Sequence, residues 1–182
     1  MAINGAPVYV TTTNGIATAS TISRTQLSMI YLWHTAANTK RIEILRIALS
    51  DGAGTSTSIT TAHCDWAINF ITAENATPGG TLQTAEQLDP DDPASSLTGA
   101  NGAIRVKAAA PTRNATDLYF MAIGNVTLTG SDQHILFDMT ISGKPIVLRA
   151  GVAEGLEINS ISPATTNNVA HQGVLTIWWR EI

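Results

Sequence analysis

The sequence predicts an all-β protein, an antiparallel β-sandwich of jelly-roll type with about ten strands. Apolar residues recur with period two, or in short continuous runs, along most of the chain, as they do in half-buried and fully buried strands. Clusters rich in Gly, Asn and Asp separate these runs and suit tight turns. No part of the chain alternates strands with long helices, which argues against a parallel sheet with crossover helices.

Ten segments fit the strand pattern. In chain order they are 7–13, 28–35, 41–49, 58–72, 104–109, 118–128, 134–141, 145–148, 156–160 and 174–182, and the fourth is long enough to bend midway. Turn clusters lie between them at 50–56 (SDGAGTS), 77–80 (TPGG), 98–102 (TGANG) and 129–132 (TGSD). The turn chemistry therefore supports the same division of the chain as the apolar pattern.

At most one short helix is expected. Residues 81–89 (TLQTAEQLD) contain good helix formers, and DPDDP directly afterwards would end a helix, although a strand fits this segment equally well. The irregular segment 89–102 is expected to be an exposed insertion or a loop that grips a partner.

Length and composition indicate a single domain with partners that cover its surface. The chain has 182 residues, enough to bury a core without disulfides or metal, and we expect one domain over 1–182 with residues 1–15 as an extended N-terminal arm. Charged residues make up only 13% of the chain, about half the usual share. Such a low share suggests that neighbouring molecules cover part of the surface.

The charge pattern and the apolar pattern exclude two classes of partner. The ten Lys and Arg residues are spread singly, without the basic stripe that binds nucleic acid. No window approaches the ~18 apolar residues that span a bilayer, and the N-terminus has no signal-peptide pattern. We therefore expect neither a nucleic acid nor a membrane partner.

The C-terminal stretch GVLTIWWREI, residues 173–182, carries a tryptophan on each face. Period-two alternation places Trp178 with Val174, Thr176 and Arg180, and it places Trp179 with Leu175, Ile177 and Glu181. A strand that is apolar on both faces needs a cover on both, which either the same chain or another copy can supply. We favour the second and predict that copies of the chain associate through Trp178 and Trp179.

The Gly-containing hinge at 149–155 is a candidate phosphate loop that does not meet the requirements. It lacks a Gly-Lys-Ser/Thr ending, and the segment that follows, EINSIS, fits a strand and not a helix whose N-terminus binds an anion. We interpret Gly151 and Gly155 as positive-φ residues of a corner between two strands.

Other chemistry-bearing residues form no convincing active site. His63 and Asp65 lie on one side of a strand and could begin a metal site with His134 or His171, but isolated histidines are more often packing or surface residues. Cys64 lies within an apolar run and suits an inert buried thiol.

Carboxylate pairs give no better candidate. Asp89, Asp91 and Asp92 lack a calcium-loop frame, and nothing places Glu154 and Glu157 on opposite sides of a sugar. We expect no enzyme activity, no cofactor and no bound metal.

The last quarter of the chain resembles jelly-roll or β-sandwich accessory proteins of tailed bacteriophage virions. The resemblance rests on KPIVLRAGVAEGLEINSIS (144–162), in which Glu154, Gly155 and Leu156 match a recurrent turn, and on Trp178 and Trp179 in a closing strand. At Ala150 the chain departs from the pattern, because the turn in those proteins often has proline there.

The resemblance implies a capsid decoration, or cement, protein. Such proteins commonly bind as trimers to the outside of a shell, so we expect a homotrimer, the major capsid protein as partner, synthesis in the host cytoplasm and a place in the virion. The uncharged N-terminal arm is expected to contact the shell by adding a strand to a neighbouring sheet. Its contact residues would be Pro7, Val8, Tyr9 and Val10.

Two alternatives stay open. A tail or fibre component with a carbohydrate-binding jelly roll would use Trp33 with His34, or Trp66 with Asp65. A cupin-like metal enzyme is the other, and the absence of a His-x-His pair counts against it.

Overall fold

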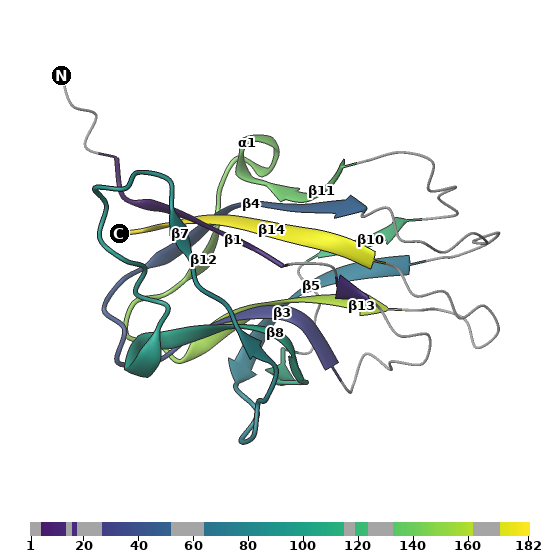
Figure 1. Ribbon diagram of the computed structural model, residues 1–182, viewed down its shortest axis with the longest axis horizontal. Coiled ribbons are helices and arrows are strands. Elements are labelled where there is room, and N and C mark those ends of the chain that lie inside the picture. Colours follow the sequence, from purple (N-terminus) through teal and green to yellow (C-terminus); the bar gives the residue numbers. More distant parts are fainter. Residues whose placement is uncertain are drawn as a thin grey trace.

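Two antiparallel β-sheets pack face to face in the computed structural model, which describes residues 5–13, 16–17, 27–51, 64–114, 119–123, 133–161 and 172–182 (Figure 1). Sheet A has the order β11 (Gln133–Asp138), β4 (Ile42–Asp51), β14 (Gln172–Glu181), β1 (Val8–Thr12), β7 (Glu86–Gln87). Two further strands join it, β12 (Ile146–Leu148) beside β4 and β2 (Ile16–Ala17) beside β14.

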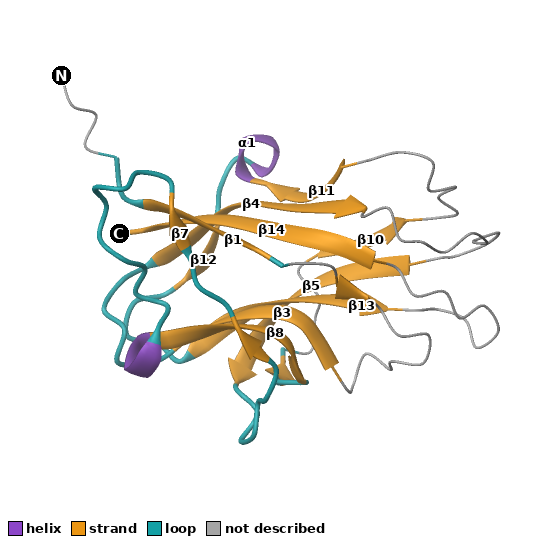
Figure 2. Cartoon of the chain, viewed as in Figure 1, coloured by secondary structure: helices purple, strands orange, loops and turns teal. Residues whose placement is uncertain are grey.

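Sheet B has the order β10 (Tyr119–Ile123), β5 (Cys64–Ala73), β13 (Glu154–Ile161), β3 (Leu27–His34), β8 (Gly102–Ala109), β6 (Thr81–Leu82), and β9 (Thr112–Arg113) pairs with β5. Strands dominate the described chain (Figure 2). Its helices are one 3-10 turn, η1 (Gly99–Asn101), and one short α-helix, α1 (Met139–Ser142). No helix in the described ranges is long and apolar enough to cross a membrane.

The strand pairing follows a jelly-roll pattern. β1 pairs with β14, β3 with β13, β4 with β11 and β5 with β10, so four antiparallel pairs are nested one inside another along the chain. The sequence-based fold class is therefore confirmed, and each of the ten predicted segments contains a strand. The parts of those segments at 58–63 and 124–128 lie outside the described residues.

The structure decides one open alternative and corrects one boundary. The segment 81–89, which fitted a helix or a strand, forms the short strands β6 and β7. The predicted strand 134–141 ends at Asp138, whose carboxylate accepts a hydrogen bond of 2.8 Å from the backbone N of Thr140 and so caps α1. Gly143 then ends the helix with a φ of 79°.

Apolar side chains on the inner faces of both sheets form one core. Trp179 and Tyr9 stack within it, with 5.9 Å between ring centroids and 28° between ring planes. The other large and fully buried aliphatic members from the two sheets include Ile30, Leu32, Ile42, Ile44, Ile47, Leu49 and Ile68. Alternation along each strand sends the next residues to the outer faces, which are the surfaces available for function.

The outer face of sheet B is largely buried within its own chain. Tyr31, Trp33 and Ile71 form a second apolar cluster there with Ala108, and Tyr31 and Ile71 are fully buried. The segment that follows β5 is fixed beside this face, because the Arg105 Nη1 donates to the carbonyl oxygen of Gly79 at 3.0 Å. Partly exposed aromatic and arginine side chains lie instead on the outer face of sheet A.

Candidate functional site

The outer face of sheet A centres on Trp178, which points away from the core. Trp178 of β14 is in register with Val10 of β1 on one side and Arg46 of β4 on the other. The guanidinium carbon of Arg46 lies 5.3 Å from the centroid of the Trp178 ring, within range of a cation–π interaction. On the far side of Arg46, Asp138 approaches its Nε to 3.9 Å. Arg46 thus lies between the half-buried tryptophan ring and the Asp138 carboxylate.

A second row of residues runs parallel to the first. Arg180 of β14 is in register with Val8 of β1 and Glu43 of β4. The Glu43 carboxylate is nearly buried, and Arg180 Nη2 and Arg41 Nη2 contact it at 2.6 and 2.7 Å. Two guanidinium groups thus offset the cost of burying one carboxylate.

We call Val8, Val10, Arg46, Trp178 and Arg180 the Trp178 face. Its valines and its tryptophan are half-buried, so apolar atoms and paired charges share a sheet surface that remains partly accessible. Because the charged groups already have partners, the arrangement suits packing against another protein surface better than proton transfer or nucleophilic attack. Tryptophan and arginine are the side chains that most often dominate such contacts.

The structure separates the predicted association residues into two groups. Trp178, Val8 and Val10 lie together on the Trp178 face, and Pro7 is half-buried beside them with its carbonyl oxygen accepting from the Glu181 backbone N at 3.2 Å. Trp179 and Tyr9 are core residues, exposed by 0% and 1%. Their burial within one chain removes these two from any contact with a partner.

The N-terminal arm needs a similar correction. Residues 8–12 form β1, which pairs with β14 along one side and with β7 along the other. Because the backbone of this segment is already paired in its own sheet, it cannot add a strand to a neighbouring molecule in this conformation. Residues 1–4 and 14–15 lie outside the described residues.

Glu181 has a structural role that the sequence analysis missed. Its nearly buried carboxylate accepts hydrogen bonds from Ser95 Oγ at 2.6 Å, from the Ser96 backbone N at 3.0 Å and from Trp179 Nε1 at 3.3 Å. The segment predicted as a partner-gripping insertion is therefore tied to the end of β14, and its Leu97 enters the core. An acidic residue on the inward face of an apolar strand was the available signal.

Tyr9 is attached to the same segment. Its hydroxyl donates to the Pro93 carbonyl oxygen at 2.8 Å. Burial of the phenol raises the pKa of Tyr9 to about 12, and the nearby carboxylates Glu181 and Asp92 add to this effect because they disfavour a second negative charge.

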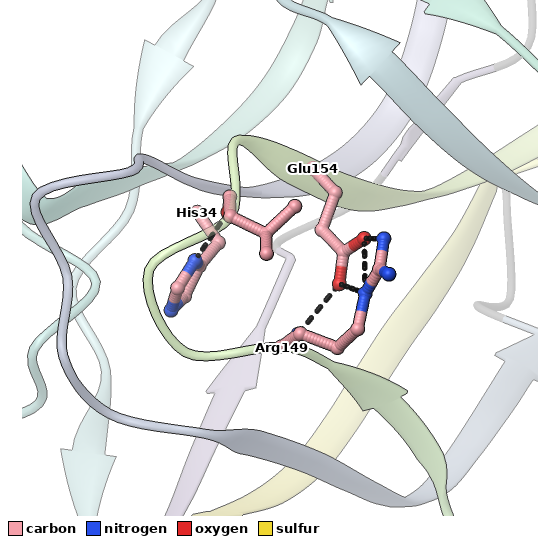
Figure 3. A network of polar contacts seen from close by, with 4 residues as sticks. His34, Arg149 and Glu154 are labelled. Atoms are coloured by element: carbon pink, nitrogen blue, oxygen red, sulfur yellow. Dashed lines mark hydrogen bonds and ion pairs between the residues drawn. The ribbon is translucent and has the colours of Figure 1, made fainter.

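The hinge between β12 and β13 is a corner, as predicted (Figure 3). The Glu154 carboxylate accepts from Arg149 Nη2 at 2.7 Å and from the Arg149 backbone N at 2.5 Å, so the arginine is paired within the hinge. The side-chain hydrogen bond to Glu154 and the negative charge of its carboxylate raise the pKa of Arg149. The buried His34 ring lies beside the hinge, with Nδ1 2.9 Å from the Val152 carbonyl oxygen and Nε2 2.8 Å from that of Lys40.

The two hinge glycines serve different purposes, which corrects one prediction. Gly151 has a φ of 72°, a left-handed conformation that favours glycine. Gly155 lies within β13, and its φ is not positive. A Cβ at Gly155 would overlap the Leu32 carbonyl oxygen and the Ile71 side chain, so glycine is needed there for close packing.

Glu154 and Glu157 do not form a catalytic pair. Glu157 is fully buried on the outer side of sheet B and pairs with Arg113, whose Nη2 lies 2.8 Å from Glu157 Oε1. In register beside it lies Tyr31, whose hydroxyl donates to Glu74 Oε1 at 2.7 Å. Burial raises the pKa of Tyr31, and this hydrogen bond raises it further. Each carboxylate thus has a structural partner.

The remaining candidates give no exposed site among the described residues. No group of three His, Cys, Asp or Glu residues is placed to hold a metal within the ranges that the structure describes. His63 and His171 lie outside them, and so do the side chains of Cys64, Asp65, Trp66 and His134. Trp33 and His34, one proposed sugar-binding pair, are exposed by only 8% and 0%. Asp89 Oδ1 accepts from the Asp91 backbone N at 3.0 Å, which is a local turn contact.

No protein-family model, curated protein or solved structure matches this chain. Among the described residues, the Trp178 face combines an aromatic side chain, two valines and two paired arginines on one partly accessible sheet surface.

Proposed function

We propose that this protein is a non-enzymatic structural protein of a bacteriophage virion, a capsid decoration protein that self-associates and binds the surface of the shell. The observation that carries the proposal is the Trp178 face, where a half-buried tryptophan lies between Val10 of β1 and Arg46 of β4 on a partly exposed sheet. The low share of charged residues and the sequence resemblance of the C-terminal quarter support the same role.

The mechanism is adhesive. Each copy would bury the Trp178 face against the major capsid protein, gaining roughly 25 cal/mol for each Å² of apolar surface removed from water. Tryptophan supplies a large apolar contact at small cost in conformational freedom, and the Arg46 guanidinium already lies against the Trp178 ring. Self-association would link several such contacts, so that a weak contact of one copy becomes a strong attachment of the assembly.

Sedimentation with undecorated shells of tailed phages tests the proposal. The wild-type protein is expected to co-sediment with shells, and Trp178→Ala is expected to bind at least about tenfold more weakly, since loss of a central interface tryptophan costs more than about 1.4 kcal/mol. Leu82→Ala is the matched control, because Leu82 is 62% exposed but lies in sheet B. Wild-type protein that ignores every shell tested, or Trp178→Ala that binds with full affinity, would contradict the proposal.

A further inference from the structure

An apolar patch lies at the edge of sheet A, away from Trp178. β11 and β12 both pair with the same side of β4, and α1 connects them, standing out from the end of β11 (Figure 1). Ile141 on α1 is 81% exposed and Ile135 on β11 is 38% exposed. Large aliphatic side chains gathered at a strand edge are a typical association surface.

The same patch also contains a hollow. A groove of about 360 Å³ is lined mainly by Ile135, Phe137, Ile141 and Ile146. Asp138 and Ser142 also line it, but the other lining residues are aliphatic or aromatic, so an apolar side chain from another molecule is the chemistry that fits it. A protruding isoleucine and an apolar groove therefore lie side by side on one surface.

The charges around Ile141 are arranged symmetrically in the sequence. Asp138 lies three residues before Ile141 and Lys144 lies three residues after it. Hydrogen bonds from Thr140 to Oδ1 lower the pKa of the Asp138 carboxyl and keep it an anion, and its Oδ2 lies 3.9 Å from Arg46 Nε, a distance that leaves room for a second cation. Lys144 is exposed. If two copies of the segment 138–144 meet antiparallel across a two-fold axis beside Ile141, each Asp138 faces the Lys144 of the other copy.

We infer that this edge is the self-association surface and that its occupant is a second copy of this chain. Two copies meet about a two-fold axis, each placing Ile141 in the groove of the other, with two Asp138–Lys144 pairs at the rim. A two-fold contact uses one surface twice and so requires it to be complementary to itself, which the knob, groove and opposite charges together provide. The inference rests on the self-association in the proposed function. It replaces the expected trimer by a dimer, and it moves the expected association of copies from Trp178 and Trp179 to this edge.

Solution mass and cross-linking test the pairing in the full chain. Light scattering is expected to give a dimer for the wild type, and Ile141→Asp is expected to raise the dimer dissociation constant at least about 30-fold, as for a central interface residue. Leu82→Asp is the control, because it places the same charge at another exposed aliphatic residue. In a Cys64→Ser background, Ile141→Cys is expected to form a disulfide between copies on oxidation, whereas Leu82→Cys is not.

The outcomes separate this inference from the proposed function. A monomeric or trimeric wild type, an Ile141→Asp variant that dimerises as well as the control, or an Ile141→Cys variant that does not cross-link would each overturn the pairing. Shell binding that is lost on Trp178→Ala would leave the shell-binding part of the proposed function intact in all of those cases, whereas a monomeric wild type would also contradict its self-association. A monomeric Ile141→Asp variant that still binds shells more weakly than wild type, through loss of multivalency, would support both.

Discussion

The ring of Trp179 stacks on the ring of Tyr9 inside the sandwich, with 5.9 Å between their centroids. Trp178, the preceding residue, lies on the opposite side of β14 with Arg46 against its ring. Two adjacent tryptophans thus belong to different environments, one in the core and one on the surface. The difference gives a direct test of which residue supports the fold and which is available to a partner.

Truncating the two tryptophans is expected to give very different stabilities. Trp179→Ala should lower the free energy of unfolding by about 3–5 kcal/mol, because it removes a buried ring and leaves a cavity. Trp178→Ala should cost only about 1 kcal/mol, the order of one exposed cation–π contact and some partial burial. Urea denaturation of both variants measures the difference. Equal costs would show that Trp178 also supports the fold of the single chain.

The sequence predicted the split between these tryptophans but not which one is buried. Period-two alternation in residues 173–182 assigns opposite faces to neighbouring residues whatever the fold. The inner face is decided by β1, whose Tyr9 comes from the other end of the chain and pairs with Trp179 in register. Local pattern carries no information on that pairing, because it depends on how distant strands meet.

The exact ends of strands and the long-range contacts of side chains also could not be predicted from local pattern. The apolar pattern of residues 134–141 continues past Asp138, but the Asp138 side chain accepts from the Thr140 backbone N and caps α1 there. The partners of Glu181 lie in residues 95–96, more than eighty positions away. The groove beside Ile141 exists only because β12 returns to pair with β4. Strand segments were thus predictable from periodicity, whereas caps, buried ion pairs and surface hollows required the three-dimensional arrangement.

Replacing the hinge glycines with alanine should separate packing from backbone conformation. Gly155→Ala is expected to cost about 1–3 kcal/mol or more, because the added methyl group overlaps the Leu32 carbonyl oxygen and Ile71. Gly151→Ala should cost about 1–2 kcal/mol, the usual penalty of a left-handed residue, because no atom lies within 4 Å of the added methyl group. Adding Ile71→Val should recover part of the loss in Gly155→Ala and none in Gly151→Ala. Thermal or urea unfolding measures these stabilities. If Ile71→Val changed the stability of Gly155→Ala and Gly151→Ala by the same amount, the packing explanation for Gly155 would be wrong.

Alkaline pH should destabilise the protein partly through Tyr9. The folded-state pKa of Tyr9 is raised from 10.0 to about 12, so its contribution is fully present below pH 10 and is lost as the pH rises toward 12. At neutral pH, Tyr9→Phe should lower the free energy of unfolding by about 1 kcal/mol, because the hydrogen bond to Pro93 is lost. Between pH 10 and pH 12, however, the variant should lose less stability than the wild type, because it has no phenol to ionise. The rest of the alkaline loss includes Tyr31, whose pKa is also raised. Parallel stability curves for wild type and Tyr9→Phe would contradict the assignment.

The buried Arg113–Glu157 pair should show strong coupling. Arg113→Met leaves the Glu157 carboxylate buried without its guanidinium partner and should cost about 3–5 kcal/mol. The double variant Arg113→Met, Glu157→Met is expected to cost less than Arg113→Met alone, because it removes both charges. A double-mutant cycle by urea denaturation measures the coupling, with the exposed Arg149–Glu154 pair as a comparison that should couple more weakly. Additive effects at Arg113 and Glu157 would show that their proximity contributes little.

Loss of the Glu181 carboxylate should release the segment that it holds. Glu181→Ala removes the acceptor for Ser95 Oγ, the Ser96 backbone N and Trp179 Nε1, and unsatisfied buried donors cost about 1–3 kcal/mol. Amide hydrogen exchange should rise most at residues 95–97, because Ser96 loses its acceptor and Leu97 packs less firmly. Glu86→Ala is the matched control, since Glu86 is exposed on β7 and its loss should change stability by less than about 0.5 kcal/mol. If Glu181→Ala lowers global stability but leaves exchange at 95–97 at the level of the rest of the chain, the carboxylate stabilises the end of β14 without fixing this segment.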